Sequence, residues 1–369
     1  MLRLIDILSF TLERLRQHRL LVLWVLVGLV MATTLALSLS LYVDAVYTDV
    51  LQTRLSDPPY AFRFRYLGAW NGNITLEDTD RASAAIEQQF DAGIDLPVDR
   101  AVSFQKGGTW SVRTKAGLSL GTFGLGTLSG AEDQMTVNGG EWDFDAAKSE
   151  PDADGAIPVL IPETMLYGMG LQVGDELQAY PPGSSNAVTL KIAALWTPVN
   201  ADDPAWIFPP KYFENVILLH GDNLKDLIKD LTKPVDETAW FVNFDGADVR
   251  TSDVAGLLTR ITDGMRDVEA ALPGIRVDLT PQEELNAFSA EVNQLTAQLV
   301  VILAPVGGLV LYFVSLVAGL LVNRQQAEDV KLRSRGISRR RLLAIHLLLW
   351  LVLIGTALVT GILLSPPLV

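Results

Sequence analysis

The chain has 369 residues, a formal net charge of −14 at pH 7, 49% hydrophobic residues and no cysteine. This length corresponds to two or three ordinary domains of roughly 100–200 residues each. The lack of cysteine excludes disulfides, thiol nucleophiles and iron–sulfur clusters, and the excess of acids disfavours nucleic-acid binding. High hydrophobicity together with a large net charge indicates a chain divided between lipid and water.

Three stretches carry no charged residue: 20–43, 297–322 and 342–364. Each reaches the roughly 20 residues that a helix needs to cross a bilayer, so we expect three transmembrane helices. The alternative for the first is a cleavable signal peptide. That stretch is longer than the apolar part of a signal peptide, about 7–15 residues, so an uncleaved anchor is favoured.

The charges between these stretches predict the orientation in the membrane. Residues 1–19 carry a net charge of +2 and residues 323–341 a net charge of +5, whereas residues 44–296 contain 39 acids and 18 bases. Because basic segments stay on the cytoplasmic side, the N-terminal segment and the 323–341 loop are predicted there. The large acidic segment and the tail, residues 365–369, are then extracytoplasmic, in a multi-pass protein of the cell (plasma or inner) membrane.

Two helices are expected to continue beyond the lipid as stalk extensions, residues 44–57 and 280–296. Residues after the first span keep helical apolar spacing up to Asp57-Pro58-Pro59, where proline disfavours further helix. Thr280-Pro281 then begins a second helix, predicted to continue into the next span. Its apolar residues step by three and four, a heptad seam that would pair the two stalk helices: Leu285, Phe288, Val292, Leu295 and Leu299. The alternative is that these apolar stripes pack on the outer domain.

Residues 58–279 are predicted to form an α+β extracytoplasmic domain, with two lobes. Alternating or β-rich stretches predict four of its strands, at residues 60–66, 110–114, 188–192 and 240–244. Helical spacing marks residues 78–90 and 248–272. The five glycines from Gly117 to Gly130 lack the spacing of a nucleotide-binding motif, and a flexible loop is expected there instead.

No residue pattern indicates catalysis. The chain contains no GxxxxGK[ST] phosphate loop, so it is not a P-loop ATPase by itself. Its histidines, His18, His220 and His346, show no metal-ligand spacing. The 39 acids of residues 44–296 are taken as a solvated surface. We therefore expect a non-catalytic protein without a cofactor.

The 323–341 loop is predicted to be a basic helix–turn–helix elbow. A helix ending at Arg335 can use Gly336 as its left-handed C-terminal residue, and Ser338 can cap the next helix. Composition alone favours a generic positive-inside loop that contacts only lipid headgroups.

The order of residues in this loop resembles that in FtsX-like and MacB-like ABC transporter permeases. The matching positions are Glu328, Leu332-Arg333, Gly336-Ile337-Ser338 and Arg339-Arg340, whereas Asp329 and Arg335 depart from the family pattern. Within the outer domain, residues 139–142, 157–163 and 170–177 resemble the family's MacB-like periplasmic core domain. The family's fourth span is not found, which fits a fragment or the first half of a longer permease.

This resemblance implies a subunit that seats on a cytoplasmic ABC ATPase and pairs with a second permease chain, as homo- or heterodimer, among membrane lipids. ATP hydrolysis would move the outer domain through the stalks and export an unknown lipid, lipoprotein, peptide or drug-like cargo. The coupling residues would be Glu328, Lys331, Leu332, Arg333, Arg335, Gly336, Ser338 and Arg339. One alternative is an FtsX-like regulator that transmits motion to an outer partner, such as a cell-wall hydrolase, without moving a solute. A span–sensor–span receptor is disfavoured because a third span follows within about 20 residues.

Overall fold

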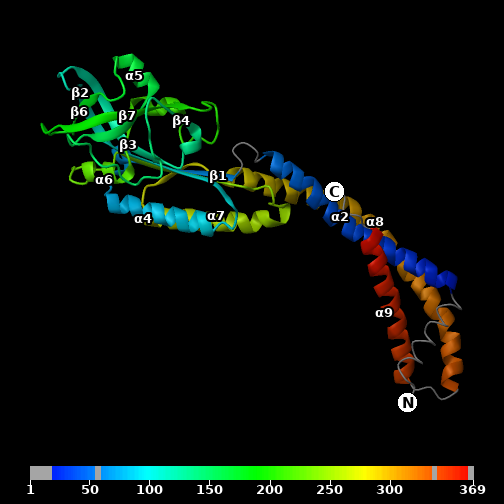
Figure 1. The fold of residues 1–369 in the computed structure, drawn as a ribbon. Coiled ribbons are helices and arrows are strands. Elements are labelled where there is room, and N and C mark those ends of the chain that lie inside the picture. Colours follow the sequence, from blue (N-terminus) through cyan, green and yellow to red (C-terminus); the bar gives the residue numbers. More distant parts are fainter. Residues whose placement is uncertain (1–18, 55–59, 335–338, 365–369) are drawn as a thin grey trace. The chain divides into compact units, whose positions relative to one another are not determined.

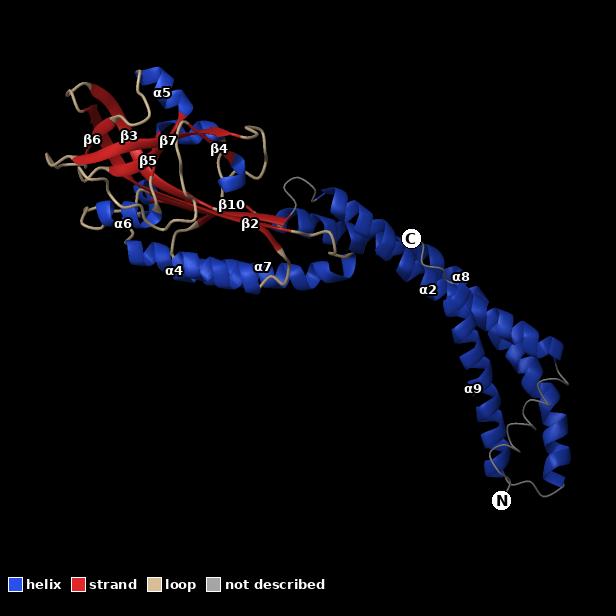
Figure 2. Ribbon diagram, in the orientation of Figure 1, coloured by secondary structure: helices blue, strands red, loops and turns tan. Residues whose placement is uncertain are grey.

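The computed structural model describes residues 19–54, 60–334 and 339–364, and the chain forms two compact units. Unit 1 comprises residues 1–50 and 288–369, and unit 2 comprises residues 51–287. Figures 1 and 2 show the elements of both units. The expected mixture of α and β structure is confirmed, because unit 2 contains one large sheet together with helices.

Three long helices form unit 1 and extend from it: α2 (Arg19–Arg54), α8 (Gln282–Ser334) and α9 (Arg339–Leu364). The predicted helix beginning near Pro281 is α8, which is continuous through Pro305. The three helices pack through a small apolar core made by Val25, Val317, Leu321, Leu349 and Leu353.

Ten strands of unit 2 join in one hydrogen-bonded sheet, in the order β10-β1-β9-β2-β3-β8-β5-β7-β4, with β6 paired to β2 and β7. The sheet is therefore continuous across the domain in which two lobes were expected. The strands are β1 (Tyr60–Leu67), β2 (Val98–Thr114), β3 (Ser119–Ser129), β4 (Met135–Asn138), β5 (Ile157–Pro162), β6 (Glu176–Tyr180), β7 (Val188–Pro198), β8 (Val216–Leu218), β9 (Glu237–Phe244) and β10 (Arg276–Leu279).

Alternation along β1 explains how the sheet buries both faces. Phe62 and Phe64 point to one face, where their rings pack against Phe90 at centroid distances of 4.8 and 4.9 Å. Two helices lie side by side beneath this face, α4 (Leu76–Ile86) and α7 (Val254–Ala271) (Figure 2). The neighbouring strand β9 is buried along its whole length, as expected for a central strand whose two faces are both covered by other elements.

The opposite face of the sheet carries a separate apolar core. Phe104 of β2 and Phe241 of β9 pack there against the segment that precedes β8. That segment ends in a short helix, η3 (Pro210–Asn215), and its aromatic residues are buried: Trp206, Phe208 and Phe213.

Short helices connect the strands. They are α3 (Gly68–Asn71), the π-helix η1 (Glu87–Ala92), η2 (Glu132–Gln134), α5 (Glu163–Met169), α6 (Gly221–Ile228) and η4 (Thr251–Asp253). The resembling stretch 157–177 folds as β5, α5 and β6, and Gly170 ends α5 at φ 66° because glycine adopts the left-handed region without strain.

The prediction of a flexible loop between Gly117 and Gly130 is wrong, because residues Ser119–Ser129 form strand β3. The glycines serve close packing rather than flexibility. A Cβ at Gly126 would lie 3.0 Å from Cγ1 of Val216 and 3.1 Å from the carbonyl oxygen of Gln105. A glycine-rich strand of this kind allows another backbone to approach closely.

Candidate functional site

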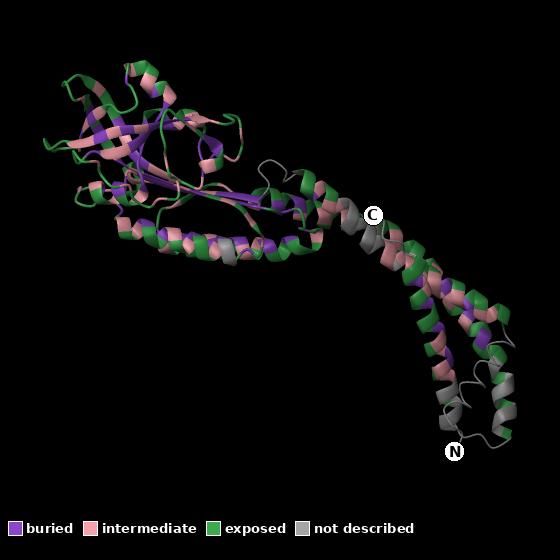
Figure 3. Cartoon of the chain, viewed as in Figure 1, coloured by how far each residue is buried: buried purple, intermediate pink, exposed green. Residues whose placement is uncertain are grey.

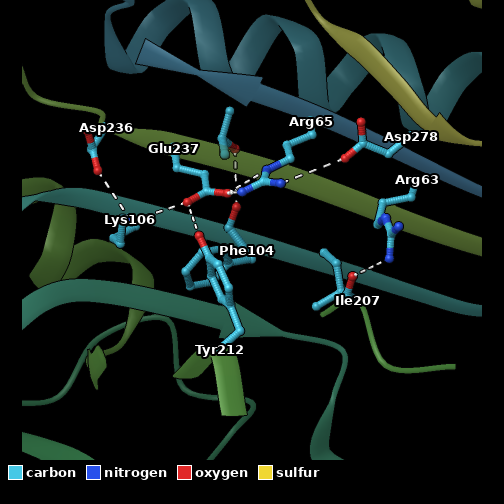
Figure 4. A network of polar contacts seen from close by, with 10 residues as sticks. Arg63, Arg65, Phe104, Lys106, Ile207, Tyr212, Asp236, Glu237 and Asp278 are labelled. Atoms are coloured by element: carbon cyan, nitrogen blue, oxygen red, sulfur yellow. Dashed lines mark hydrogen bonds and ion pairs between the residues drawn. The ribbon is translucent and has the colours of Figure 1, made fainter. Parts of the chain in front are cut away.

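A buried carboxylate, Glu237, organises the most connected polar group of unit 2 (Figure 4). Its side chain is 2% exposed. Arg65 donates to Oε1 through Nε at 2.7 Å and through a second guanidinium nitrogen at 2.6 Å. Lys106 Nζ lies 3.2 Å from Oε2, and the Tyr212 hydroxyl donates to the same oxygen. We call these four residues, with Asp236 and Asp278, the Glu237 cluster.

The elements position these groups through sheet register. Lys106 of β2 lies directly opposite Glu237 of β9, and Arg65 of β1 lies opposite Ala239, two residues further along. Tyr212 comes from η3, outside these three strands. The cluster therefore ties three neighbouring strands to the segment that covers them.

Aromatic rings complete the surroundings of the cations. The Arg65 guanidinium lies 4.9 Å from the centroid of Phe208, and Lys106 Nζ lies 5.9 Å from that of Tyr212. Cation–π contacts of this kind offset part of the cost of removing a charge from water. Because donors already occupy both Glu237 oxygens, the arrangement suits a structural role, holding the strands and η3 together, rather than proton transfer.

Burial and charge shift the pKa values of these groups. Burial is the main cause that raises the pKa of Tyr212 to about 12, and the hydrogen bond to Glu237 adds to it. For Lys106, burial alone would lower the pKa, but attraction to Tyr212, Glu237 and Asp236 outweighs it and the pKa is raised. Burial also raises the pKa of Tyr60 to about 12.

We expect the stability of unit 2 to fall as pH rises from about 10 to about 12. The unfolded tyrosines ionise near their usual pKa of 10, whereas folded Tyr60 and Tyr212 keep their protons to about 12. The stabilisation is therefore present below pH 10 and is lost through this window. Urea midpoints measured across the window test it. The double variant Tyr60→Phe/Tyr212→Phe should show a shallower decline, and a wild-type midpoint that does not change would contradict the assignment.

The predicted stalk seam lies on α8. Leu285 and Phe288 are fully buried, at 0% and 2% exposure, whereas the other seam residues, Val292, Leu295 and Leu299, are half-buried. Within unit 1, the Phe288 ring meets Tyr47 of α2 edge-on, with centroids 6.2 Å apart. The pairing of two stalk helices stays a prediction.

The predicted elbow falls at the junction of α8 and α9. Glu328, Lys331, Leu332 and Arg333 belong to the last turns of α8, and Arg339 is the first residue of α9. The turn residues Arg335, Gly336 and Ser338 lie outside the described residues. Their coupling role stays a prediction.

Two helical stretches are long and apolar enough to cross a membrane, Gln282–Arg324 and His346–Leu364. Only 6% of the most apolar window of the first is buried, and 22% of that of the second (Figure 3). The first predicted span appears among the described residues as a shorter apolar stretch, Arg19–Leu35, within α2. So much exposed apolar surface is unusual for a soluble protein, which supports contact with lipid.

Among the described residues, no group of three or more His, Cys, Asp or Glu side chains could hold a metal ion. His220 is 6% exposed and its ring contacts Ser149 and the Asp143 carbonyl. Neither the contacts of His220 nor the Glu237 cluster was predicted from the sequence. The sequence signal for the cluster is a charged residue at the start of a mostly apolar strand, which is a common pattern.

No protein-family model matches the chain, and no curated protein matches it. Among solved structures, the chain is similar to the crystal structure of a domain from a Porphyromonas gingivalis protein provisionally described as a permease. The sequence identity is 17%, the TM-score is 0.34, and the match covers 61% of this chain and 91% of that one. This likeness is too distant to assign the chain to a family.

Proposed function

We propose that the chain is the permease subunit of an ABC transporter, coupled to a separate cytoplasmic ATPase. The observation that carries the proposal is the charge pattern around the apolar helices. A basic segment, residues 323–341, joins the ends of α8 and α9, whereas residues 44–296 hold 39 of the 43 acids. The resemblance of this basic segment to the elbow of FtsX-like and MacB-like permeases supports the same assignment.

In this proposal the outer domain moves as ATP is hydrolysed, and α2 and α8 carry the motion. Helices suit this role because every backbone hydrogen bond lies within the helix. Leu285 and Phe288 are the buried residues of the seam, and their packing would keep α8 from sliding along its own axis. The proposed result is export of a lipid, peptide or drug-like cargo by a dimer of such chains.

The proposed topology can be tested directly because the chain has no cysteine. We expect Ser184→Cys, in an exposed loop of unit 2, to react with a membrane-impermeant maleimide added to intact cells. Ser334→Cys, at the end of α8, should react only after the membrane is opened. Labelling of both positions in intact cells would rule out the proposed orientation.

The partner can be tested by charge reversal in the elbow. We expect Lys331→Glu combined with Arg333→Glu to reduce co-purification of a co-expressed candidate ABC ATPase, one that co-purifies with the wild-type chain, by at least tenfold. Two reversed charges at one interface create like-charge contacts that cost several kcal/mol. Arg266→Glu, on an exposed part of α7, is the matched control and should leave co-purification unchanged. Equal recovery of the ATPase with all variants would remove the coupling role from the elbow.

A further inference from the structure

A polar pocket of about 490 Å³ lies in unit 2, between α4, the sheet and the start of α6. Its volume is within the range of small-molecule sites, about 300–1,000 Å³. A second, more apolar pocket of about 390 Å³ adjoins it, and both are lined by Ser83, Ser103, Ser129 and Trp240. The Glu237 cluster lines neither pocket.

One wall of the polar pocket is a loop that the fold holds in place. His220 Nε2 lies 2.8 Å from the Asp143 carbonyl oxygen, so this nitrogen carries the proton and donates. The other ring nitrogen, Nδ1, then accepts from the Ser149 hydroxyl at 2.5 Å. The Trp142 ring stacks on the imidazole with centroids 4.1 Å apart. Asn223 Oδ1 accepts from the Ser149 backbone N–H at 2.8 Å, and Asn223 Nδ2 donates to the Ser149 carbonyl oxygen at 3.0 Å. These contacts fix the loop before any ligand arrives, which reduces the entropic cost of binding.

The floor of the pocket holds an unsatisfied donor. Gln105 of β2 is 9% exposed, and its Nε2 has no hydrogen-bond partner among the described residues. It lies opposite Thr238 on β9 and Thr127 on β3, and all three residues line the pocket. Since a buried amide N–H without a partner is costly, a ligand oxygen that accepts from Nε2 would stabilise this site.

The rim is negatively charged. Four carboxylates line the pocket, those of Asp80, Glu132, Asp145 and Asp222, together with one cation, Lys225. Lys225 Nζ already bonds Asp80 at 2.7 Å. The rim therefore repels anions and favours a ligand that carries a positive group.

These features together select one class of ligand. Serine and threonine hydroxyls both donate and accept, carboxylates only accept, and the Gln105 amide N–H only donates. A polyamine would satisfy the carboxylates but leave Gln105 without a partner, whereas a polyol provides donors and acceptors in one molecule. Phe144, half-buried at the rim, adds an apolar surface for sugar C–H groups. We infer that this pocket binds a saccharide that carries a free amino group.

The test uses the full chain in lipid nanodiscs and a trisaccharide of β-1,4-linked glucosamine as the probe, with binding measured by calorimetry. We expect Gln105→Met, of similar volume, to weaken binding at least tenfold. Gln134→Met is the matched control and should not change binding. Gln134 is also a buried glutamine, at 3% exposure, and its side-chain nitrogen and oxygen have no hydrogen-bond partner among the described residues, but it does not line this pocket. If Gln105→Met does not fold, Thr127→Val removes a floor hydroxyl instead and should weaken binding in the same direction.

Two further probes separate the contributions to binding. Maltotriose, which lacks the amino groups, should bind at least tenfold more weakly than the glucosamine trisaccharide. Spermidine should bind weakly and show no dependence on Gln105. Spermidine binding as tight as that of the trisaccharide would mean that the pocket attracts cations without recognising a sugar, and would overturn the inference. An absence of trisaccharide binding to the wild type would overturn it as well. Because no ATPase is present, a failure here is distinct from a failure of the proposed function.

Discussion

Replacing Glu237 with Gln is expected to destabilise unit 2 by about 3 kcal/mol, because breaking a buried ion pair leaves its partner charges uncompensated. The two cations that remain, Arg65 and Lys106, have side chains only 26% and 20% exposed. Water therefore replaces the lost carboxylate poorly. Urea unfolding followed by tryptophan fluorescence measures the change.

Glu176→Gln is the matched control for this prediction. Glu176 pairs with Lys115 at 2.8 Å, but the Lys115 side chain is 72% exposed. Exposed pairs contribute about 0–1 kcal/mol, so the control should remain close to the wild type. Equal effects of the two substitutions would mean that the Glu237 cluster contributes no more than a surface pair. The double variant Arg65→Gln/Glu237→Gln should lose less than the sum of the single changes, because the two residues share one interaction.

Gly130→Ala is expected to cost about 3 kcal/mol or more, for two reasons that act together. The residue has φ 80°, where side chains other than hydrogen are strained. An added Cβ would also overlap the carbonyl oxygen of Ala101, a backbone atom that a rotamer change cannot move away. Forced overpacking of this kind typically costs about 1–3 kcal/mol beyond the conformational strain. The unfolding midpoint of the variant measures the total.

Gly117→Ala separates the two causes. Gly117 has φ 89°, but nothing lies within 4 Å of an added Cβ. Only the conformational strain remains, so a loss of about 1 kcal/mol is expected. If Gly117→Ala were as damaging as Gly130→Ala, the overlap with Ala101 would not be the main cause of the lost stability.

The sequence predicted elements best where one local pattern determined them. The alternation of residues 60–66 corresponds to β1, and the helical spacing of residues 248–272 contains α7. The predicted strand 110–114 is only the end of β2, which begins at Val98. The earlier part was missed because Gly107 and Gly108 interrupt its alternation. There the ladder to β3 shifts register, and such an irregularity cannot be recognised without the partner strand.

The Glu237 cluster could not be predicted for a different reason. Its members are residues 65, 106, 212, 236, 237 and 278, which lie far apart in the sequence. The register of β1, β9 and β2 brings Arg65, Lys106 and Glu237 together, and Tyr212 reaches them from η3. In sequence, Glu237 is one of 43 acids with no local sign of burial. Gln105 also has no local sign of burial in the sequence. That its Nε2 lacks a hydrogen-bond partner can be recognised only in the folded structure, where the residue lines a pocket. Long-range pairing, rather than local propensity, determines both sites.

The position of β9 between β1 and β2 also constrains how unit 2 can fold during synthesis. The first strand begins at residue 60, but its neighbours begin at residues 237 and 276. An emerging polypeptide therefore exposes the edges of β1 and β2 until nearly the whole domain has left the ribosome. Pairing between distant segments slows folding, and unpaired edges invite aggregation. Chaperones that hold extended chains should therefore matter more for this domain than for one built from consecutive hairpins.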